Sequence, residues 1–269
     1  MKWINPRIEY IGDIAIIKVP FNVIYKNEDI LSLAEDILKK YKFIKSVWLA
    51  ASPVKGELKI RDFIHLLGEN RSTTIYKEHN CLFRLDIKKV FITPRLSYEH
   101  LRIANLVKEN ERIVNMFAGV GLFSIIIAKK SKPKIVHSID INPEAYNYMK
   151  ENINLNKVND IVIPYVGDAK DVIEENLIDS ADRVLMPLPD LALPYLKYAV
   201  LALNKEGYIH IYLHIKANKL QDPITISNEQ VINALNNFNI EYKLINSKIV
   251  RTVGPRFYQV VIDVYAKKH

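Results

Sequence analysis

The chain has 269 residues, a formal net charge of +8, 49% apolar residues and 25% charged residues. These values are typical of a globular protein of one large or two modest domains. The charge is compatible with nucleic acid as a partner, although a lysine-rich proteome gives the same balance. The single cysteine, Cys81, excludes an internal disulfide and a cysteine-cluster metal site. No apolar run could span a bilayer and no signal-peptide segment follows Met1–Pro6, so we expect a cytoplasmic protein.

The first third of the sequence predicts a small α+β module. A helix is expected over Glu28–Tyr41, because apolar residues recur there at spacings of three and four. The predicted strands are Ile14–Val19, Ser46–Ala50, Val90–Thr93 and a hairpin of Thr73–Tyr76 with Cys81–Asp86, turning at His79-Asn80. We place the domain boundary near residues 88–95 and assign residues 1–92 to this module.

After Pro94 the predicted elements alternate between helices and strands. The helices are Glu99–Lys108, Gly121–Lys130, Pro143–Asn154, Ala169–Asn176 and Pro194–Leu203. The strands are Ile113–Phe117, Ile135–Ile139, Ile161–Val166, Arg183–Met186, Tyr208–His214, Lys243–Ile249 and Arg256–Val264. Alternation of this kind favours a parallel sheet with helices on both faces. The predicted fold class over residues 93–269 is therefore α/β.

A glycine turn, Phe117-Ala118-Gly119-Val120-Gly121, follows the first strand of this second part. Asp140 ends the next strand and lies 19 residues past Gly121 (140 − 121), near the spacing of about 20 residues expected for a ribose-binding acid. Glycines let a ligand approach the backbone. The third glycine of a dinucleotide fingerprint is missing. S-adenosylmethionine is therefore the expected ligand, although such a turn also joins strand to helix in other α/β proteins.

Two later strand ends carry further candidates. Asp168 either accepts a hydrogen bond from the adenine amino group or caps the helix that begins at Ala169. The segment Met186-Pro187-Leu188-Pro189 is stiffened by its prolines. It is either a binding loop that presents carbonyl groups to a planar base or a rigid connection.

A third candidate group is Arg95, Glu99 and Arg102, which share one face of a predicted helix. This spacing is typical of a surface ion pair. The alternative is that Glu99 faces the cofactor as a base and is held by the arginines. The local sequence does not separate the two interpretations.

Taken together, these motifs resemble the archaeal and eukaryotic type of tRNA guanine-37 N1-methyltransferase, from about Ile8 onward. The matching segments are Ile11–Ala15, Leu67–Glu69, Thr74, Lys77, Glu78, Phe91–Arg95 with Glu99, Phe117–Gly121, Asp140–Pro143, Asn156-Lys157 and Gly254–Arg256. The resemblance implies a class I, Rossmann-like methyltransferase sheet behind a small RNA-contacting domain. It implies S-adenosylmethionine as cofactor and the anticodon stem-loop of tRNA as partner. We expect a monomer without a membrane partner.

The resemblance also implies residue roles. Glu99 matches the general base that takes the N1 proton of guanine. Lys59 or Arg61 matches the arginine that stabilises negative charge on O6. The implied cofactor-binding residues are Phe117, Gly119, Gly121, Asp140, Ile141, Asp168, Ala169 and Met186. The implied substrate-binding residues are Arg95, His100, Pro187, Leu188, Pro189 and Arg256. No metal is implied.

Three features depart from the family pattern. Lys59 takes the position of the family arginine and lacks its planar fork. Pro187 replaces the asparagine of an Asn-Leu-Pro motif. The chain is also too short for the domain with which many members inspect the tRNA elbow. A bifunctional enzyme that also methylates C7 of the tricyclic wyosine precursor is compatible with these departures.

Three alternative functions stay open. The related wybutosine-pathway aminocarboxypropyl transferase is disfavoured by Pro94-Arg95-Leu96 and by Leu122-Phe123. A non-catalytic tRNA-binding protein is disfavoured by the intact glycine turn and Asp140. A small-molecule methyltransferase would use its N-terminal domain as a lid, and its binding would not weaken steeply with salt as RNA binding does.

Overall fold

A computed structural model describes residues 6–20, 26–54, 56 and 58–269. Residues 1–5, where we expect no signal peptide, lie outside the described residues. The chain divides into two compact units, Met1–Pro94 and Arg95–His269. They are called the small unit and the large unit below.

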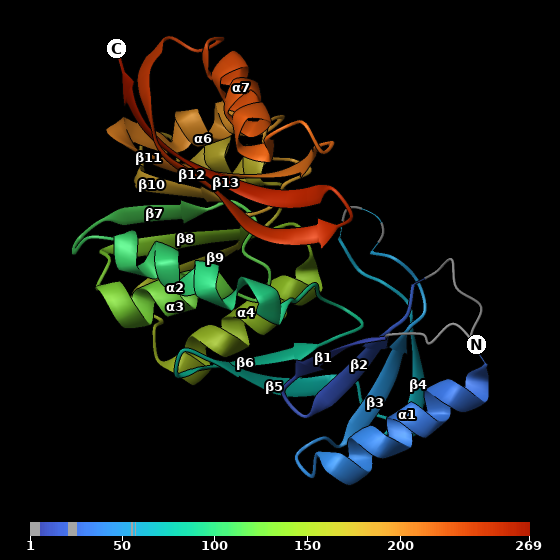
Figure 1. The fold of residues 1–269 in the computed structure, drawn as a ribbon. Helices are drawn as coiled ribbons and strands as arrows, with labels where there is room; N and C mark the ends of the chain where they lie inside the picture. Colours follow the sequence, from blue (N-terminus) through green and yellow to red (C-terminus); the bar gives the residue numbers. More distant parts are fainter. Residues whose placement is uncertain (1–5, 21–25, 55, 57) are drawn as a thin grey trace. The chain divides into compact units, whose positions relative to one another are not determined.

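The small unit contains a four-stranded sheet in the order β1-β2-β3-β4 (Figure 1). Its strands are β1 (Arg7–Ile11), β2 (Ile14–Lys18), β3 (Ser46–Ala50) and β4 (Phe63–Gly68). Helix α1 (Asn27–Lys40) links the parallel strands β2 and β3, and buries Ile30, Ala34 and Ile37 in the core they share. A separate hairpin of β5 (Thr73–Glu78) and β6 (Cys81–Asp86) turns at His79 and Asn80, as predicted.

The turn between β1 and β2 is held against β5. Gly12 has a φ of 58°, and a Cβ there would lie 2.2 Å from Oγ1 of Thr74, so this position requires glycine. The neighbouring Asp13 carboxylate accepts a hydrogen bond of 2.6 Å from the Thr74 hydroxyl and one of 2.7 Å from the Arg71 guanidinium. The turn therefore joins the sheet to the hairpin within the small unit.

The large unit is built on a seven-stranded sheet in the order β12-β13-β11-β10-β7-β8-β9. Its strands are β7 (Arg112–Asn115), β8 (Ile135–Asp140), β9 (Val162–Val166), β10 (Ala181–Met186), β11 (Leu203–Lys216), β12 (Ile240–Gly254) and β13 (Phe257–Lys268). Strands β7 to β11 are parallel, whereas β13 is antiparallel to both of its neighbours. The strand order reverses between β7 and β10. In sheets of this type, ligands bind at the carboxyl ends of the strands at this point of reversal.

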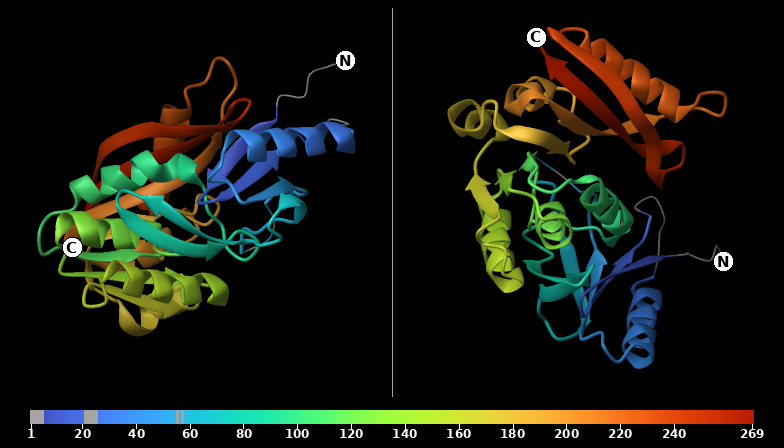
Figure 2. Two further views of the ribbon diagram at one scale, coloured as in Figure 1. Left: turned by 90° about the horizontal axis from the view of Figure 1, so that it is seen from below. Right: turned by 90° about the vertical axis from the view of Figure 1, so that its left-hand side faces the viewer.

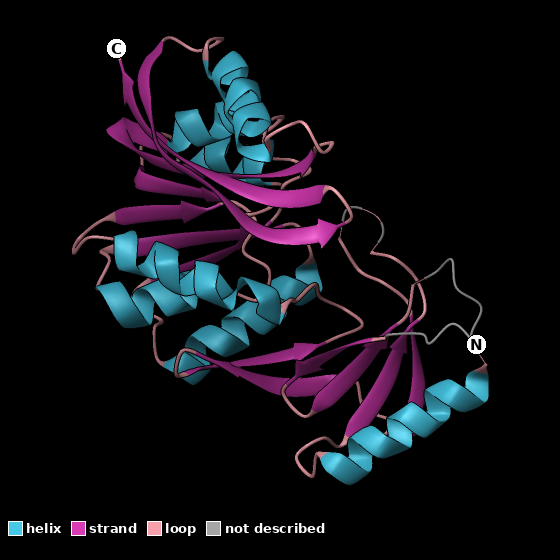
Figure 3. Ribbon diagram, in the orientation of Figure 1, coloured by secondary structure: helices cyan, strands magenta, loops and turns pink. Residues whose placement is uncertain are grey.

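Helices cover both faces of this sheet, which confirms the predicted α/β class (Figures 1, 2 and 3). One face carries α2 (Ser97–Leu106), α3 (Leu122–Ser131) and α4 (Pro143–Asn156), and the other carries α5 (Ala169–Asn176), α6 (Leu196–Ala202) and α7 (Pro223–Leu235). Buried residues of α5 to α7 form one core with the strands, including Ile173, Leu196 and Val231.

Four segments differ from the sequence predictions. The strand predicted at Val90–Thr93 is wrong, because this stretch is a loop that leads into a short 3-10 turn at Pro94–Leu96. Strands β1 and β4 and helix α7 were not predicted. Helix α7 had a readable start, since Asp222 caps the amides of Ile224 and Thr225 and a proline follows it. No helix in the described part of the chain is long and apolar enough to cross a membrane.

Candidate active site

The glycine turn follows β7 and leads into α3. Gly119 and Gly121 have φ values of 57° and 94°, which glycine adopts without strain. A Cβ built on Gly119 would have no atom within 4 Å, so the turn borders open space in which a ligand can approach its backbone. A Cβ on Gly121 would lie 3.0 Å from Cδ1 of Ile125, so this glycine allows α3 to pack closely.

Asp140 at the end of β8 contacts this turn directly. One carboxylate oxygen accepts a hydrogen bond of 2.6 Å from the amide of Gly119, and the other accepts one of 2.9 Å from the amide of Asn142. Burial raises the pKa of Asp140, and these two backbone hydrogen bonds oppose that rise. Each oxygen keeps acceptor capacity for a ribose hydroxyl. The arrangement therefore fits the adenosyl group of S-adenosylmethionine.

Asp168 lies at the end of β9 and caps α5, because its side chain accepts a hydrogen bond of 3.0 Å from the amide of Lys170. Its carboxylate also accepts from the hydroxyl of Tyr195 at 2.9 Å. The Tyr195 ring meets the ring of Phe117 edge-on, 5.6 Å away. The capping alternative is thus observed, and the adenine-binding role of Asp168 stays a prediction.

The other predicted cofactor residues also lie at the carboxyl ends of the parallel strands. Met186 ends β10 and is fully buried, Ala169 begins α5 and is buried, and Ile141 follows β8 with 37% of its surface exposed. The structure therefore brings the predicted cofactor set to one edge of the sheet, where ligands of this fold bind.

Replacing Asp140 tests the cofactor site. Asp140→Ala removes the carboxylate that is predicted to accept hydrogen bonds from both ribose hydroxyls. Hydrogen bonds to a charged group contribute about 1.5–3 kcal/mol each, so we expect the Kd for S-adenosylmethionine to rise by tenfold or more. Isothermal titration calorimetry measures it, with the exposed Asp160→Ala as the control for loss of one carboxylate. Unchanged affinity in the Asp140→Ala protein would remove this residue from the site.

A second cluster surrounds Glu99, which is buried in α2 with 1% of its surface exposed. Its Oε1 accepts hydrogen bonds from Nη2 of Arg102 (2.6 Å) and from the hydroxyl of Tyr212 (2.8 Å). Its Oε2 lies 3.0 Å from Nε of Arg102 and 3.0 Å from Nζ of Lys248. The ion pair between Glu99 and Arg102 therefore exists, but it lies in the interior instead of on the surface.

This cluster continues into the sheet. Asp263 on β13 accepts hydrogen bonds from Arg102 (2.7 Å) and from Nδ1 of His210 (2.6 Å). Arg183 donates to Nε2 of His210 at 2.6 Å and pairs with Glu111 at 2.8 Å. Because Nε2 accepts, His210 is neutral and carries its proton on Nδ1. The result is a buried polar chain that fixes the position of Arg102 and, through it, of Glu99.

The charges in this cluster decide the protonation of Glu99. Burial alone would raise the pKa of Glu99, but the hydrogen bonds and charge of Arg102, with the bonds from Tyr212 and Lys248, outweigh burial and lower it. Burial lowers the pKa of His210. Glu99 is therefore an ionised carboxylate at neutral pH, which is the state a proton acceptor requires.

The predicted substrate residues are placed less uniformly. Arg95 is exposed in the 3-10 turn before α2, whereas His100 is buried with its ring 4.4 Å from that of Phe123. Pro187, Leu188 and Pro189 form a half-buried loop after β10. Arg256 lies in the turn between β12 and β13 with a φ of 53°. Their contacts with substrate stay predictions.

Lys59 and Arg61 lie in the loop before β4 of the small unit, where Lys59 has a φ of 54°. Glu99 belongs to the large unit. Their predicted action on the same base therefore stays a prediction.

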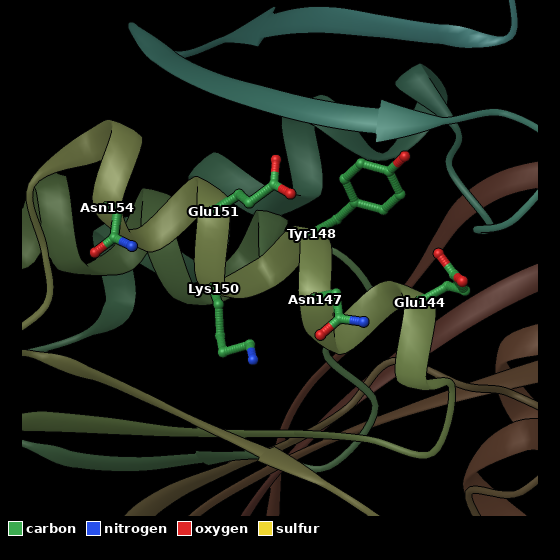
Figure 4. Close-up of a pocket in the computed structure, with 6 residues that line it drawn as sticks. All are labelled: Glu144, Asn147, Tyr148, Lys150, Glu151 and Asn154. Atoms are coloured by element: carbon green, nitrogen blue, oxygen red, sulfur yellow. The ribbon is translucent and has the colours of Figure 1, made fainter.

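A hollow along α4 coincides neither with the predicted cofactor residues nor with the cluster around Glu99. Figure 4 shows the six side chains that line it, which are Glu144, Asn147, Tyr148, Lys150, Glu151 and Asn154. None of them belongs to the predicted site.

Four members of the Glu99 cluster were not predicted from the sequence: His210, Tyr212, Lys248 and Asp263. His210 is buried, with 1% of its surface exposed. Alternation along β11 and β13 places His210 with Tyr212, and Asp263 with Val261, on the same face of the sheet. Only a correct pairing register, which a single sequence does not provide, would have identified them.

The sheet order, the glycine turn and Asp140 at the end of the second strand define a class I methyltransferase, the class that uses S-adenosylmethionine. Comparison with known families identifies the group within this class. Residues 74–241 match the TRM5/TYW2 methyltransferase domain, and the chain belongs to this family.

Similarity to characterised relatives extends over nearly the whole chain. The tRNA 4-demethylwyosine(37)-methyltransferase Taw21 of Saccharolobus solfataricus is 45% identical over 260 residues, which cover 97% of this chain and 94% of that protein. The tRNA (guanine(37)-N(1))-methyltransferase Trm5b of Pyrococcus abyssi is 35% identical, with coverage of 97% and 75%. The tRNA(Phe) (4-demethylwyosine(37)-C(7)) aminocarboxypropyltransferase of Methanocaldococcus jannaschii is 35% identical, with coverage of 96% of each.

Solved structures agree with this assignment. A complex of aTrm5 with tRNALeu has a TM-score of 0.84 at 32% identity, covering 97% of this chain and 72% of that one. The TYW2 protein of M. jannaschii in complex with AdoMet has a TM-score of 0.72 at 29% identity, covering 98% and 100%. The predicted family and fold are thereby confirmed.

Proposed function

We propose that this protein transfers a methyl group from S-adenosylmethionine to the base at position 37 of tRNA, at N1 when that base is guanine. S-adenosylmethionine supplies an electrophilic methyl group when it is bound. The residues that would hold it are Gly119, Gly121 and Asp140. Action on tRNA is supported by the names of the relatives and by the solved aTrm5–tRNALeu complex. A cytoplasmic, monomeric enzyme acting at the anticodon stem-loop is part of the proposal.

The observation that carries this proposal is the buried Glu99 carboxylate, which is held by Arg102, Tyr212 and Lys248 in the same unit as the cofactor cradle. The N1 position of guanine bears a proton at neutral pH and is a poor nucleophile until that proton leaves. A carboxylate held by Arg102 and Tyr212 can accept it, with a gain of about 10²–10⁴ in rate for a well-placed general base. For the donor to O6, Lys59 and Arg61 are the candidates that the family resemblance implies.

A second candidate substrate is 4-demethylwyosine at the same tRNA position. It is favoured by the 45% identity with Taw21 across 94% of that protein. Pro187 in place of the family asparagine is compatible with a site for a larger, tricyclic base. The two candidates share the cofactor, the tRNA and the position, and differ in the atom that is methylated.

Product mass distinguishes the candidates. The protein is incubated with S-adenosylmethionine and tRNA that carries either guanine or 4-demethylwyosine at position 37. The tRNA is then digested, and the masses of its nucleosides are measured by mass spectrometry. A methyl addition to guanosine supports the first candidate, and one to 4-demethylwyosine supports the second. An aminocarboxypropyl addition would overturn methyl transfer. Cofactor binding without any product on either tRNA would favour a non-catalytic RNA-binding protein.

For the small unit we propose RNA contact through a hollow next to the β1–β2 turn. Its lining includes Phe43, Arg71, Ile75 and Arg84. Phe43 and Ile75 are 57% and 53% exposed, and Arg84 pairs with Ile75 across the hairpin. An exposed aromatic ring beside arginines suits a nucleotide, because the base stacks on the ring while the cations attract phosphate.

The paired change Phe43→Ala with Arg84→Ala tests this surface. Stacking contributes about 1–3 kcal/mol per base, so we expect the Kd for tRNA to rise by roughly tenfold. The dependence of log Kd on log salt should also become shallower, because one phosphate contact is lost. Filter binding measures both quantities. Leu31→Ala removes another exposed apolar side chain, 40% exposed, from α1 and should change neither quantity. Wild-type affinity and salt dependence in the double variant would exclude the hollow as an RNA contact.

A further inference from the structure

Lys248 on β12 lies next to Glu99 and belongs to none of the sequence motifs. A register shift between Leu244 and Asn246 changes the face on which the following side chains lie. Asn246 then pairs with Asp263 and donates a hydrogen bond of 3.1 Å to its carboxylate. Lys248, two residues further along, lies on the same face. Its Nζ lies 3.0 Å from Oε2 of Glu99.

Lys248 is the most accessible of the three partners of Glu99. Its side chain is 29% exposed, compared with 14% for Arg102 and about 1% for the whole of Tyr212. Its Nζ also lies 5.2 Å from the centre of the ring of Tyr98, a residue that is 77% exposed. Asp263 also binds Arg102 and restrains it, whereas Lys248 has a long flexible side chain that is partly exposed to solvent. Because Lys248 is the most exposed of these partners, we expect a base that reaches Glu99 to lie beside Lys248.

The pair of Oε2 and Nζ is complementary to one edge of guanine. An acceptor lies next to a cationic donor at 3.0 Å. Guanine offers the reverse order on its Watson–Crick edge, with the N1–H donor next to the O6 acceptor. Adenine offers an acceptor at N1 and a donor at its amino group. Its N1 would therefore face the acceptor Oε2 of Glu99, and its amino group would face the donor Nζ of Lys248. Extruded bases are recognised along this edge.

We infer that Lys248 binds O6 of the target base while Glu99 takes the proton from N1, so that the two residues together select guanine and promote its methylation. This inference rests on the proposed function. In the reaction N1 loses its proton to Oε2 and gains the methyl group, and the sulfonium of the cofactor becomes a neutral thioether. Electron density that moves onto O6 as the proton leaves is stabilised by the ammonium group of Lys248. The donor to O6 then comes from the unit that carries Glu99.

The same geometry accommodates 4-demethylwyosine, which keeps the exocyclic oxygen of guanine. Lys248 would bind that oxygen. The ring nitrogen beside it carries no proton in the tricyclic base, so Glu99 would instead accept the proton that leaves C7 as this carbon gains the methyl group. Lys248 is therefore expected to matter for both candidate substrates.

The test compares guanine with 6-thioguanine at position 37, because sulfur is a much weaker hydrogen-bond acceptor than oxygen. Single-turnover methylation rates are measured for the wild-type protein and for Lys248→Met, Lys248→Arg and the exposed Lys243→Met of the same strand. We expect Lys248→Met to slow methylation of guanine by roughly 10²-fold, the effect of losing one such donor. Lys248→Arg should recover most of the rate, and Lys243→Met should match the wild type.

The decisive quantity is the ratio of the rates on guanine and 6-thioguanine. If Lys248 binds O6, the wild-type protein should methylate guanine faster than 6-thioguanine, and this ratio should fall toward one in Lys248→Met. A lysine with only a structural role would leave the ratio unchanged. An unchanged ratio, or a loss of the ratio in Lys59→Met or Arg61→Met instead, would overturn the inference. Cofactor affinity and the thermal midpoint identify variants that do not fold. Absence of methylation by the wild-type protein on any position-37 substrate would contradict the proposed function itself, which separates the two failures.

Discussion

Glu99→Gln is expected to lower the rate of methyl transfer by about 10²–10⁴-fold, the contribution of a positioned general base. The amide has nearly the shape of the carboxylate but cannot take up the N1 proton at neutral pH. Single-turnover methylation of tRNA measures the change. The affinity for S-adenosylmethionine should stay near the wild-type value, because Asp140 and the glycine turn belong to other elements of the sheet edge.

Tyr212→Phe is the matched control for this experiment. It removes one donor, at 2.8 Å from Oε1, and leaves the carboxylate in place. We expect a small change in rate, because Arg102 and Lys248 still hold Glu99. A loss as large as that of Glu99→Gln would mean that disturbed packing accounts for both. A Glu99→Gln protein with the wild-type rate would remove Glu99 as the base.

Asp263→Ala is expected to lower the free energy of unfolding by about 3–5 kcal/mol, because it leaves Arg102 and His210 without their shared buried partner. Urea unfolding followed by circular dichroism measures the change. Asp179→Ala removes a carboxylate of the same unit from a pair with Lys268, in which the Asp179 side chain is 64% exposed. That control should cost at most about 1 kcal/mol. Equal losses in the two variants would contradict the structural role of Asp263.

The free energy of unfolding of the large unit should also decrease in two steps as the pH falls, first through His210 and then through Asp263. Burial lowers the pKa of His210, so the folded state keeps the neutral imidazole below about pH 6.5 while the unfolded chain takes up a proton there. Stability therefore declines as pH falls below the unfolded pKa of about 6.5. Burial tends to raise the pKa of Asp263, but His210 and Arg102 outweigh this and lower it. Its contribution is therefore present above about pH 3.9 and is lost as pH falls below that value. The difference in stability between the wild-type protein and Asp263→Ala should accordingly shrink below about pH 4.

The cofactor cradle could be predicted from the sequence because its parts are local. Gly119 and Gly121 lie in one turn, and Asp140 ends the next strand of a parallel pair, so their meeting follows from the βαβ connection. The two units also follow from local signals, with a division after Pro94. Short strands such as β4 were missed because their burial alternates only weakly.

The surroundings of Glu99 could not be predicted in the same way. Arg102 is one helical turn away and was recognised as a neighbour, but Tyr212, Lys248 and Asp263 arrive from three strands more than 100 residues later in the chain. Their positions depend on the register of β11, β12 and β13, including the shift at Leu244. A one-residue change in register would turn Lys248 to the other face. Long-range pairing of this kind has no local sequence signal.

Methylation of unmodified tRNA with guanine or adenine at position 37, using labelled S-adenosylmethionine, tests the proposed reaction most directly. We expect label in 1-methylguanosine with the guanine tRNA and none with the adenine tRNA, because Glu99 needs a proton donor at N1. Equal labelling of both tRNAs would contradict the proposed reaction at position 37.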